Sequence, residues 1–206
     1  MSIADGSGRG AVVTDHVYIR IDDEYAWIPA QLLVVQQDEG MAHVAIPLYE
    51  SEEFIMSDGG KGAVEFKTAI VNLKDYSDGA LPLQNCGSDG GTCEEVDDIV
   101  DLLHLHEAAI LYNLKNRHCH GKPYSRVGNI VIAVNPYQWL GELYTDQVQM
   151  RYAQAMVWDH HGRDDDPRIG LPPHIYEVSS LCYKRLAEEK RNQSILVTGI
   201  SGAGKT

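Results

Sequence analysis

The sequence predicts a small all-β barrel followed by the incomplete start of an α/β unit. Two patterns of apolar residues support this: short alternating runs lie between residues 16 and 70, and a spacing of three and four residues appears after residue 97. The charge divides in the same way. Residues 1–103 carry 20 acidic and 5 basic side chains, whereas residues 104–206 carry 10 and 12. Such asymmetry indicates two units with different roles.

The first unit is predicted to be a barrel over residues 14–80. Polar turns separate four short runs, and the first and last of them alternate apolar with polar side chains, which is typical of antiparallel strands. The predicted strands are Val17–Ile21, Tyr25–Gln36, Ala42–Ile46 and Val64–Ile70. Residues 1–13 are rich in Gly and Ser and are expected to form a mobile terminus. Residues 81–96 are expected to be a linker.

The second unit, residues 97–206, is predicted to alternate helices with strands. Apolar residues recur at helical spacing over 97–116, and Gly121 and Pro123 should end that helix. Further helices are expected over Tyr144–Val157 and from Pro172-Pro173 onward. The continuously apolar runs Asn129–Val134 and Ser194–Thr198 are typical of strands covered on both faces. Such alternation favours an α/β sheet.

The composition narrows the classes of function. The net charge of −13 argues against a nucleic-acid binder, which needs a basic surface. The longest apolar run, Ile130–Val134, is far too short to span a membrane. Four Cys without a secretory signal indicate free thiols in a reducing compartment.

One motif carries recognisable chemistry. Directly after the predicted strand Ser194–Thr198, the chain reads G-x-x-x-x-G-K-T, the pattern of a phosphate-binding loop. Its residues are Gly199, Ile200, Ser201, Gly202, Ala203, Gly204, Lys205 and Thr206. Glycines let successive backbone N–H groups converge on phosphate oxygens. Lys205 should reach the β- and γ-phosphates, and Thr206 should offer its hydroxyl to Mg²⁺. The alternative is a Gly-rich turn that binds nothing.

Other groups of polar residues predict less. Paired histidines at 104/106, 118/120 and 160/161 are interpreted as solvated or capping side chains rather than as metal ligands, and Asp164–Asp166 as a solvated loop.

Several segments resemble the myosin motor head, in the order that this family has them. They are LYNLKNRH at Leu111–His118, YSRVGNIVIAVNPYQWL at Tyr124–Leu140, PPHIYEVSSLCYKRL at Pro172–Leu186, and NQSILVTGISGAGKT at Asn192–Thr206. LPLQN at Leu81–Asn85 is similar to the junction that precedes the head. The strands before it resemble the small Src-homology-like barrel that many myosins carry. The resemblance therefore implies a P-loop NTPase motor domain over residues 97–206.

This resemblance implies that ATP with Mg²⁺ is the substrate and that Lys205 is catalytic. Asn135, Pro136 and Tyr144 match the positions that line the family's adenine pocket. F-actin would bind through regions absent from this chain, and light chains or calmodulin would bind a neck that is also absent. The implied location is the cytoplasmic actin cytoskeleton, with no nucleic acid bound and no membrane insertion.

The chain departs from the family pattern in several places. Ile200 replaces the usual Glu, the spacing from Pro136 to Tyr144 is one residue longer, and the acidic loop 159–171 is long. The family's two switch segments are missing, so we expect an amino-terminal piece of a motor, without useful ATPase activity by itself. One alternative is a naturally short, non-enzymatic interaction module that uses the acidic barrel. Another phosphate-loop enzyme, such as a kinase, is disfavoured because about 198 residues precede the loop.

Overall fold

The computed structural model describes residues 15–20, 27–36, 38–48, 65–86, 95–158 and 166–205. The chain divides into two compact units, Met1–Cys93 and Glu94–Thr206. Three features of the sequence therefore lie outside the described residues: the Gly- and Ser-rich terminus 1–13, Thr206, and residues 159–165 of the acidic loop 159–171.

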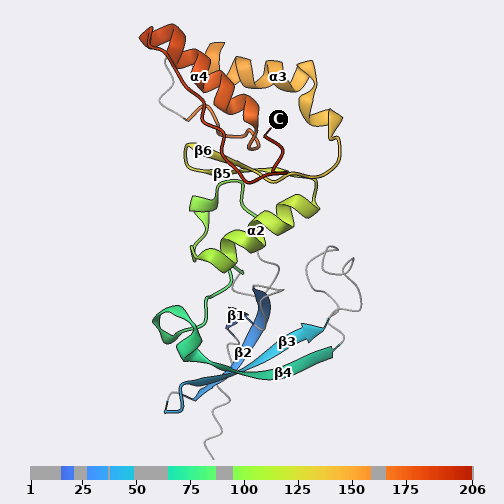
Figure 1. Ribbon diagram of the computed structural model, residues 1–206, viewed down its shortest axis with the longest axis vertical. Coiled ribbons are helices and arrows are strands. Elements are labelled where there is room, and N and C mark those ends of the chain that lie inside the picture. The colour runs from blue at the N-terminus through green and yellow to red at the C-terminus, as the bar shows by residue number, and fades with distance from the viewer. Residues whose placement is uncertain are drawn as a thin grey trace, which may run out of the picture. The chain divides into compact units, whose positions relative to one another are not determined.

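The first unit contains a four-stranded antiparallel sheet in the order β1-β2-β3-β4 (Figure 1). Its strands are β1 (His16–Ile19), β2 (Ile28–Gln36), β3 (Met41–Leu48) and β4 (Glu65–Asn72). All four predicted strands are thus confirmed where the chain is described, whereas the predicted ends at Ile21, Tyr25 and Val64 lie outside the described residues. A bulge in β2 between Leu32 and Val34 changes the register against β3.

The prediction of a closed barrel is wrong for the described residues, because the sheet is open. β1 is only four residues long, and its outer edge is paired by the chain after β4 rather than by β4 itself. Tyr18 N donates to Pro82 O at 2.8 Å, and Gln84 N donates to His16 O at 2.8 Å. Residues 82–84 therefore satisfy backbone groups that strand-to-strand closure would have used.

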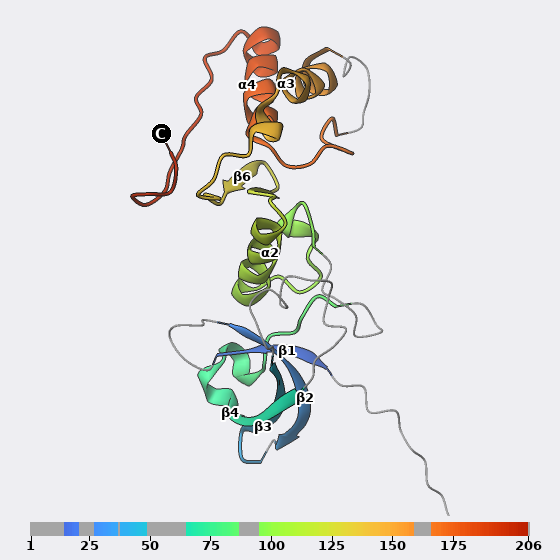
Figure 2. The same ribbon diagram turned by 90° about the vertical axis from the view of Figure 1, so that its right-hand side faces the viewer.

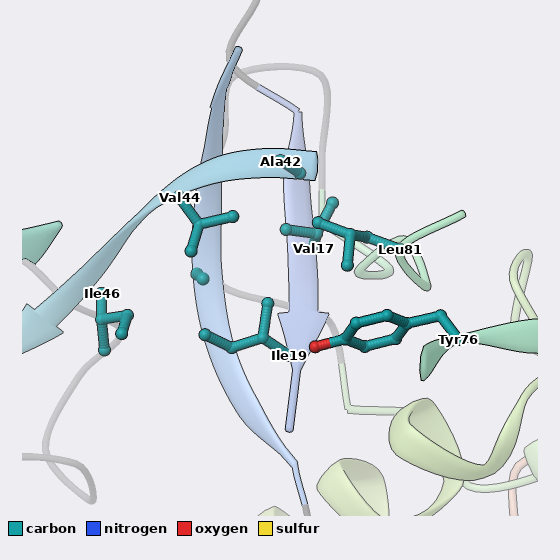
Figure 3. Packing of buried hydrophobic residues seen from close by; sticks show 8 residues of the cluster. Val17, Ile19, Ala42, Val44, Ile46, Tyr76 and Leu81 are labelled. Carbon is teal, nitrogen blue, oxygen red and sulfur yellow. The ribbon is translucent and has the colours of Figure 1, made fainter. Parts of the chain in front are cut away.

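The core of the first unit lies on one face of this sheet (Figure 3). Val17 and Ile19 of β1 face Ala42, Val44 and Ile46 of β3, and Tyr76 and Leu81 cover them. Alternate side chains of a strand point to opposite faces, which is why every second residue of β3 is buried here. The Tyr76 hydroxyl reaches past this core and accepts a hydrogen bond from Arg20 N at 3.1 Å.

In the second unit, the helix predicted over 97–116 begins later than expected. Asp98 caps a single 3-10 turn, Ile99–Asp101, and α2 spans Glu107–Cys119. The break occurs because His106 is extended and its Nδ1 accepts a hydrogen bond from Ala109 N at 3.2 Å, as an N-cap residue does. The predicted end is confirmed, since the helix stops just before Gly121, whose φ is +68°.

β5 (Tyr124–Val127) and β6 (Ile130–Ala133) form an antiparallel hairpin, and Gly128 turns between them with φ +60°. The expectation that Asn129–Val134 would be covered on both faces is wrong, since Ile130 is 66% exposed. Ser194–Thr198 is not a strand in this structure, and Leu196 is 90% exposed. Strands need hydrogen-bonded neighbours, and no strand among residues 95–158 and 166–205 flanks this run. The predicted α/β sheet is therefore absent from the described part of the second unit.

Two helices lie side by side in both views of the second unit (Figures 1 and 2). α3 (Asp146–Ala153) is capped by the Thr145 hydroxyl and continues into a π-helical turn, Gln154–Trp158. The predicted helix start at Tyr144 belongs instead to a separate 3-10 turn, Gly141–Tyr144. α4 (Ile175–Glu189) follows Pro172-Pro173 as predicted, and Tyr152, Met156 and Leu171 form the core beside it. Among the described residues, no helix is both long and apolar enough to cross a membrane.

Candidate functional site

The predicted phosphate loop has a backbone that only glycine suits at several positions. Gly202 and Gly204 both have φ +81°, a conformation that side chains with a Cβ rarely adopt. At Gly199, an added Cβ would lie 3.1 Å from Ala203 Cβ and 3.8 Å from Lys205 Cδ. The loop is therefore a closely folded turn. Glycine is favoured by conformation at two positions, and a side chain at a third would be a tight fit.

The side chain of Lys205 folds back onto this turn. Its Nζ donates to Gly199 O at 2.8 Å and to Ile200 O at 2.7 Å. A third donor of the ammonium remains for a ligand, because each ammonium group carries three N–H bonds. The Ile200 side chain is 83% exposed and carries no charge, so it offers the ammonium no competing ion pair. The ammonium thus lies against the turn and is held by two of its carbonyl groups.

The structure brings one of the three predicted adenine-pocket residues to the loop. Asn135 Nδ2 donates to Gly202 O at 3.2 Å, although 67 positions separate the two residues in the chain. Pro136 follows Asn135 and is half-buried. Residues from the end of β6 and from the phosphate loop therefore share one site.

Tyr144 is held in a different set of contacts. Its hydroxyl lies 2.7 Å from the Tyr124 hydroxyl, and its ring stacks on Trp139 with a centroid distance of 5.4 Å. Burial and this Tyr144 hydroxyl raise the pKa of Tyr124 above its usual range. Tyr144 thus belongs to an aromatic cluster. No hydrogen bond within residues 95–158 and 166–205 joins its side chain to the loop.

His174 lies at the centre of this cluster, and sequence reasoning missed it. Its ring has four tyrosine neighbours at centroid distances of 4.5–5.6 Å: Tyr124, Tyr144, Tyr152 and Tyr176. Nδ1 accepts a hydrogen bond from Tyr176 N at 3.0 Å and so caps α4, whereas Nε2 is buried without a hydrogen-bond partner. Burial lowers the pKa of His174, so the neutral ring is favoured. The available signal was a His directly after the Pro172-Pro173 pair that opens the predicted helix.

A buried ion pair fixes α4 to the hairpin. Arg126 Nε donates to both carboxylate oxygens of Glu177, at 3.2 and 2.9 Å, and Arg126 Nη2 donates to Leu171 O at 2.7 Å. Both side chains are almost fully enclosed. The sequence signal would have been an acidic residue two positions after Ile175, near the apolar face of the predicted helix.

A second buried arginine ties the start of the unit to α2. Arg117 is 2% exposed and donates to Asp97 Oδ1 at 2.7 Å, to Val96 O at 3.1 Å and to Tyr124 O through both Nε and Nη2. Glu95 also accepts from it at 3.2 Å. These contacts satisfy nearly every donor of the guanidinium. They hold residues 95–97, which precede α2 in the chain, and Tyr124, which follows it, against Arg117.

The predicted metal ligand, Thr206, lies outside the described residues. Where the chain is described, no group of three or more His, Cys, Asp or Glu side chains could hold a metal ion.

The family model described as "Myosin head (motor domain)" matches residues 96–206. The chain belongs to the myosin head family. The match covers all of the described second unit after Glu95, including the loop and Asn135. The resemblance seen in the sequence is therefore confirmed.

Curated relatives from Arabidopsis thaliana extend this likeness into the first unit. Myosin-16 is 32% identical over 197 residues, which is 95% of this chain and 13% of that protein. Myosin-17 is 31% identical over 195 residues, which is 95% of this chain and 10% of that protein. Myosin-15 is 41% identical over 111 residues, which is 54% of this chain and 7% of that protein. The chain thus spans about a tenth of the length of the relatives that it matches.

Proposed function

We propose that this myosin-head chain binds the phosphates of ATP, with Mg²⁺, through Gly199–Thr206. The observation that carries the proposal is the closely folded turn, which places Lys205 Nζ over the loop and has two glycines at φ +81°. Backbone N–H groups and one ammonium suit a polyphosphate. The whole-chain charge of −13 has little bearing on such a site.

In this proposal Lys205 contacts the β- and γ-phosphates and stabilises negative charge there. The hydroxyl of Thr206 would hold Mg²⁺, and the metal would supply charge neutralisation at the phosphates. Pro136 and Tyr144 are proposed to lie on the base side. We further propose that the chain is the amino-terminal part of a myosin-type motor, which hydrolyses ATP and moves along F-actin in the cytoplasmic actin cytoskeleton. Light chains or calmodulin are proposed as further partners of such a motor, without nucleic acid or membrane insertion.

The test is a titration of the chain with a fluorescent ATP analogue in Mg²⁺ buffer. Lys205→Ala should weaken binding by at least about tenfold, since a hydrogen bond to a charged group contributes roughly 1.5–3 kcal/mol. Lys115→Ala is the matched control, because it removes an exposed lysine of α2. Equal affinity of the two variants, or no binding by the unmutated chain, would refute phosphate binding at this loop.

We also propose that this chain binds ATP without turning it over. The sequence contains neither an N-x-x-S-S-R segment nor a D-x-x-G-F-E segment, with which the family is expected to position water and Mg²⁺. Phosphate release that requires Mg²⁺ and disappears in Lys205→Ala would contradict this part. The rival role as a non-enzymatic interaction module is less well supported, because the family match lies over the unit that contains the loop.

A further inference from the structure

We propose that Asn135 is a positioning residue of the phosphate loop: its carboxamide holds the carbonyl of Gly202 and does not read the base. This inference rests on the proposed phosphate binding at Gly199–Thr206 and changes the role expected for Asn135 from the family resemblance. That resemblance places Asn135 in an adenine pocket. The contacts of its side chain point to the phosphates instead.

Both ends of the Asn135 carboxamide are engaged by the protein. Nδ2 donates to Gly202 O at 3.2 Å, and Oδ1 accepts from Tyr137 N at 2.9 Å. The second bond fixes the rotation of the amide, because exchanging oxygen and nitrogen would place two donors against each other. The amide group is therefore oriented toward the loop before any ligand arrives.

The side chain of Asn135 also lies in the space that a side chain at Gly204, the second of the two positive-φ glycines, would use. A Cβ added to Gly204 would lie 3.4 Å from Asn135 Nδ2 and 3.5 Å from Asn135 Cγ. Asn135 thus leaves little room for a side chain at Gly204 and makes a hydrogen bond to Gly202. The directions of the loop N–H groups depend on these two glycine conformations, so Asn135 favours one arrangement of donors.

The backbone of Asn135 is anchored on the side away from the loop. His118 Nε2, in the last turn of α2, lies 3.2 Å from Asn135 O and donates to it in the Nε2–H tautomer. The preceding residue, Val134, donates its N–H to Pro123 O at 2.8 Å. Asn135 is therefore held by α2 and by the residue before β5, and its bond to Gly202 fixes the loop relative to these elements.

Tripolyphosphate separates a positioning role from base recognition, because it has phosphates and no base. We expect Asn135→Ala to weaken the binding of ATP and of tripolyphosphate by the same factor, roughly 3- to 10-fold for one lost hydrogen bond. Gln147→Ala, which removes an exposed amide of α3, should change neither. Weaker ATP binding with unchanged tripolyphosphate binding would overturn the inference, because it would place Asn135 at the base.

A second measurement needs no ligand. Amide hydrogen exchange of residues 199–205 should be faster in Asn135→Ala and in Asn135→Asp than in the unmutated chain and in Gln147→Ala. Asn135→Asp keeps the acceptor for Tyr137 N but replaces the donor to Gly202 O by a charged carboxylate oxygen, so both variants lose that bond. Unchanged exchange in both variants would overturn the inference. If exchange rises and no polyphosphate binds the unmutated chain, the positioning role stands and the proposed function fails.

Discussion

Replacing Glu177 by Gln should destabilise the second unit more than any exposed charge change on the same helix. Glu177 lies in the first turn of α4 and is 2% exposed. Its carboxylate accepts from Arg126 Nε at 2.9 Å and lies 2.7 Å from Arg126 Nη2. Glu177→Gln preserves the shape of the side chain but leaves the guanidinium without a counter-charge. The substitution thus removes one negative charge from a site that is almost fully shielded from solvent.

The size of the effect follows from this burial. Removing one partner of a buried ion pair costs about 3–5 kcal/mol, because the other charge stays desolvated. Gln retains one oxygen acceptor for Arg126, so we expect the lower end, about 3 kcal/mol. With a urea m-value of about 2 kcal/mol/M, the unfolding midpoint should fall by roughly 1.5 M.

The assay is urea unfolding followed by tryptophan fluorescence in a Trp27→Phe background, where Trp139 and Trp158 report on the second unit. Glu188→Gln is the control, since Glu188 is on the same helix, is half-exposed and lies 3.9 Å from Lys184. It should cost less than about 0.5 kcal/mol. Replacing the pair together, Arg126→Met with Glu177→Leu, should recover most of the stability. Equal midpoints for Glu177→Gln and Glu188→Gln would refute the importance of the buried pair.

Three further results are expected, all in urea unfolding. Because burial lowers the pKa of His174, its neutral form stabilises the fold above about pH 6.5, and this contribution is lost as pH falls through the folded pKa. His174→Asn, which can still cap α4, should flatten the decline of the unfolding free energy between about pH 7.5 and 5. An unchanged decline in this variant would contradict the role of His174. Glu95 is partly buried, which raises its pKa, yet hydrogen bonds from Lys122 and His120 hold that pKa below 4.5 overall. Its stabilisation is therefore present above that value and lost in acid, and Glu95→Gln should cost about 1 kcal/mol at neutral pH and nothing once the carboxyl is protonated. Tyr152→Phe removes the hydrogen bond from the Tyr152 hydroxyl to Pro172 O at 2.6 Å and should lower the unfolding free energy by about 1 kcal/mol. Burial also raises the pKa of Tyr152 to about 12, so the same substitution should remove a phenol that ionises at high pH in an absorbance titration.

The first unit was largely predictable because its strands alternate. Val17 and Ile19 on β1 have the period of two that a half-buried strand requires, and both are in the core. The open edge was not predictable, because backbone hydrogen bonds from residues 82–84 to β1 involve no side-chain pattern. The same holds for the late start of α2. The apolar spacing continues through His106, but an extended backbone at that residue interrupts the helix.

In the second unit, apolar runs were a poor guide to burial. Ser194–Thr198 has the composition of a buried strand, but burial also needs neighbouring strands, and composition cannot supply them. The phosphate loop, by contrast, could be located from sequence alone, because its glycine and lysine positions are required by local geometry. The bond from Asn135 to Gly202 could not, since it joins residues 67 positions apart and follows from the path of the chain after β6. His174 and Glu177 were missed for a related reason: their burial depends on α4 packing against other elements.

The exposed run before the loop has a practical consequence for handling this protein. Ile195, Leu196 and Val197 are each more than half exposed, and they follow one another in a chain that forms neither helix nor strand. Consecutive β-branched and aliphatic side chains on an unpaired backbone are a template for intermolecular β-pairing. Aggregation of the chain should therefore increase with concentration, and a charged replacement at Leu196, which is 90% exposed, should raise the usable concentration.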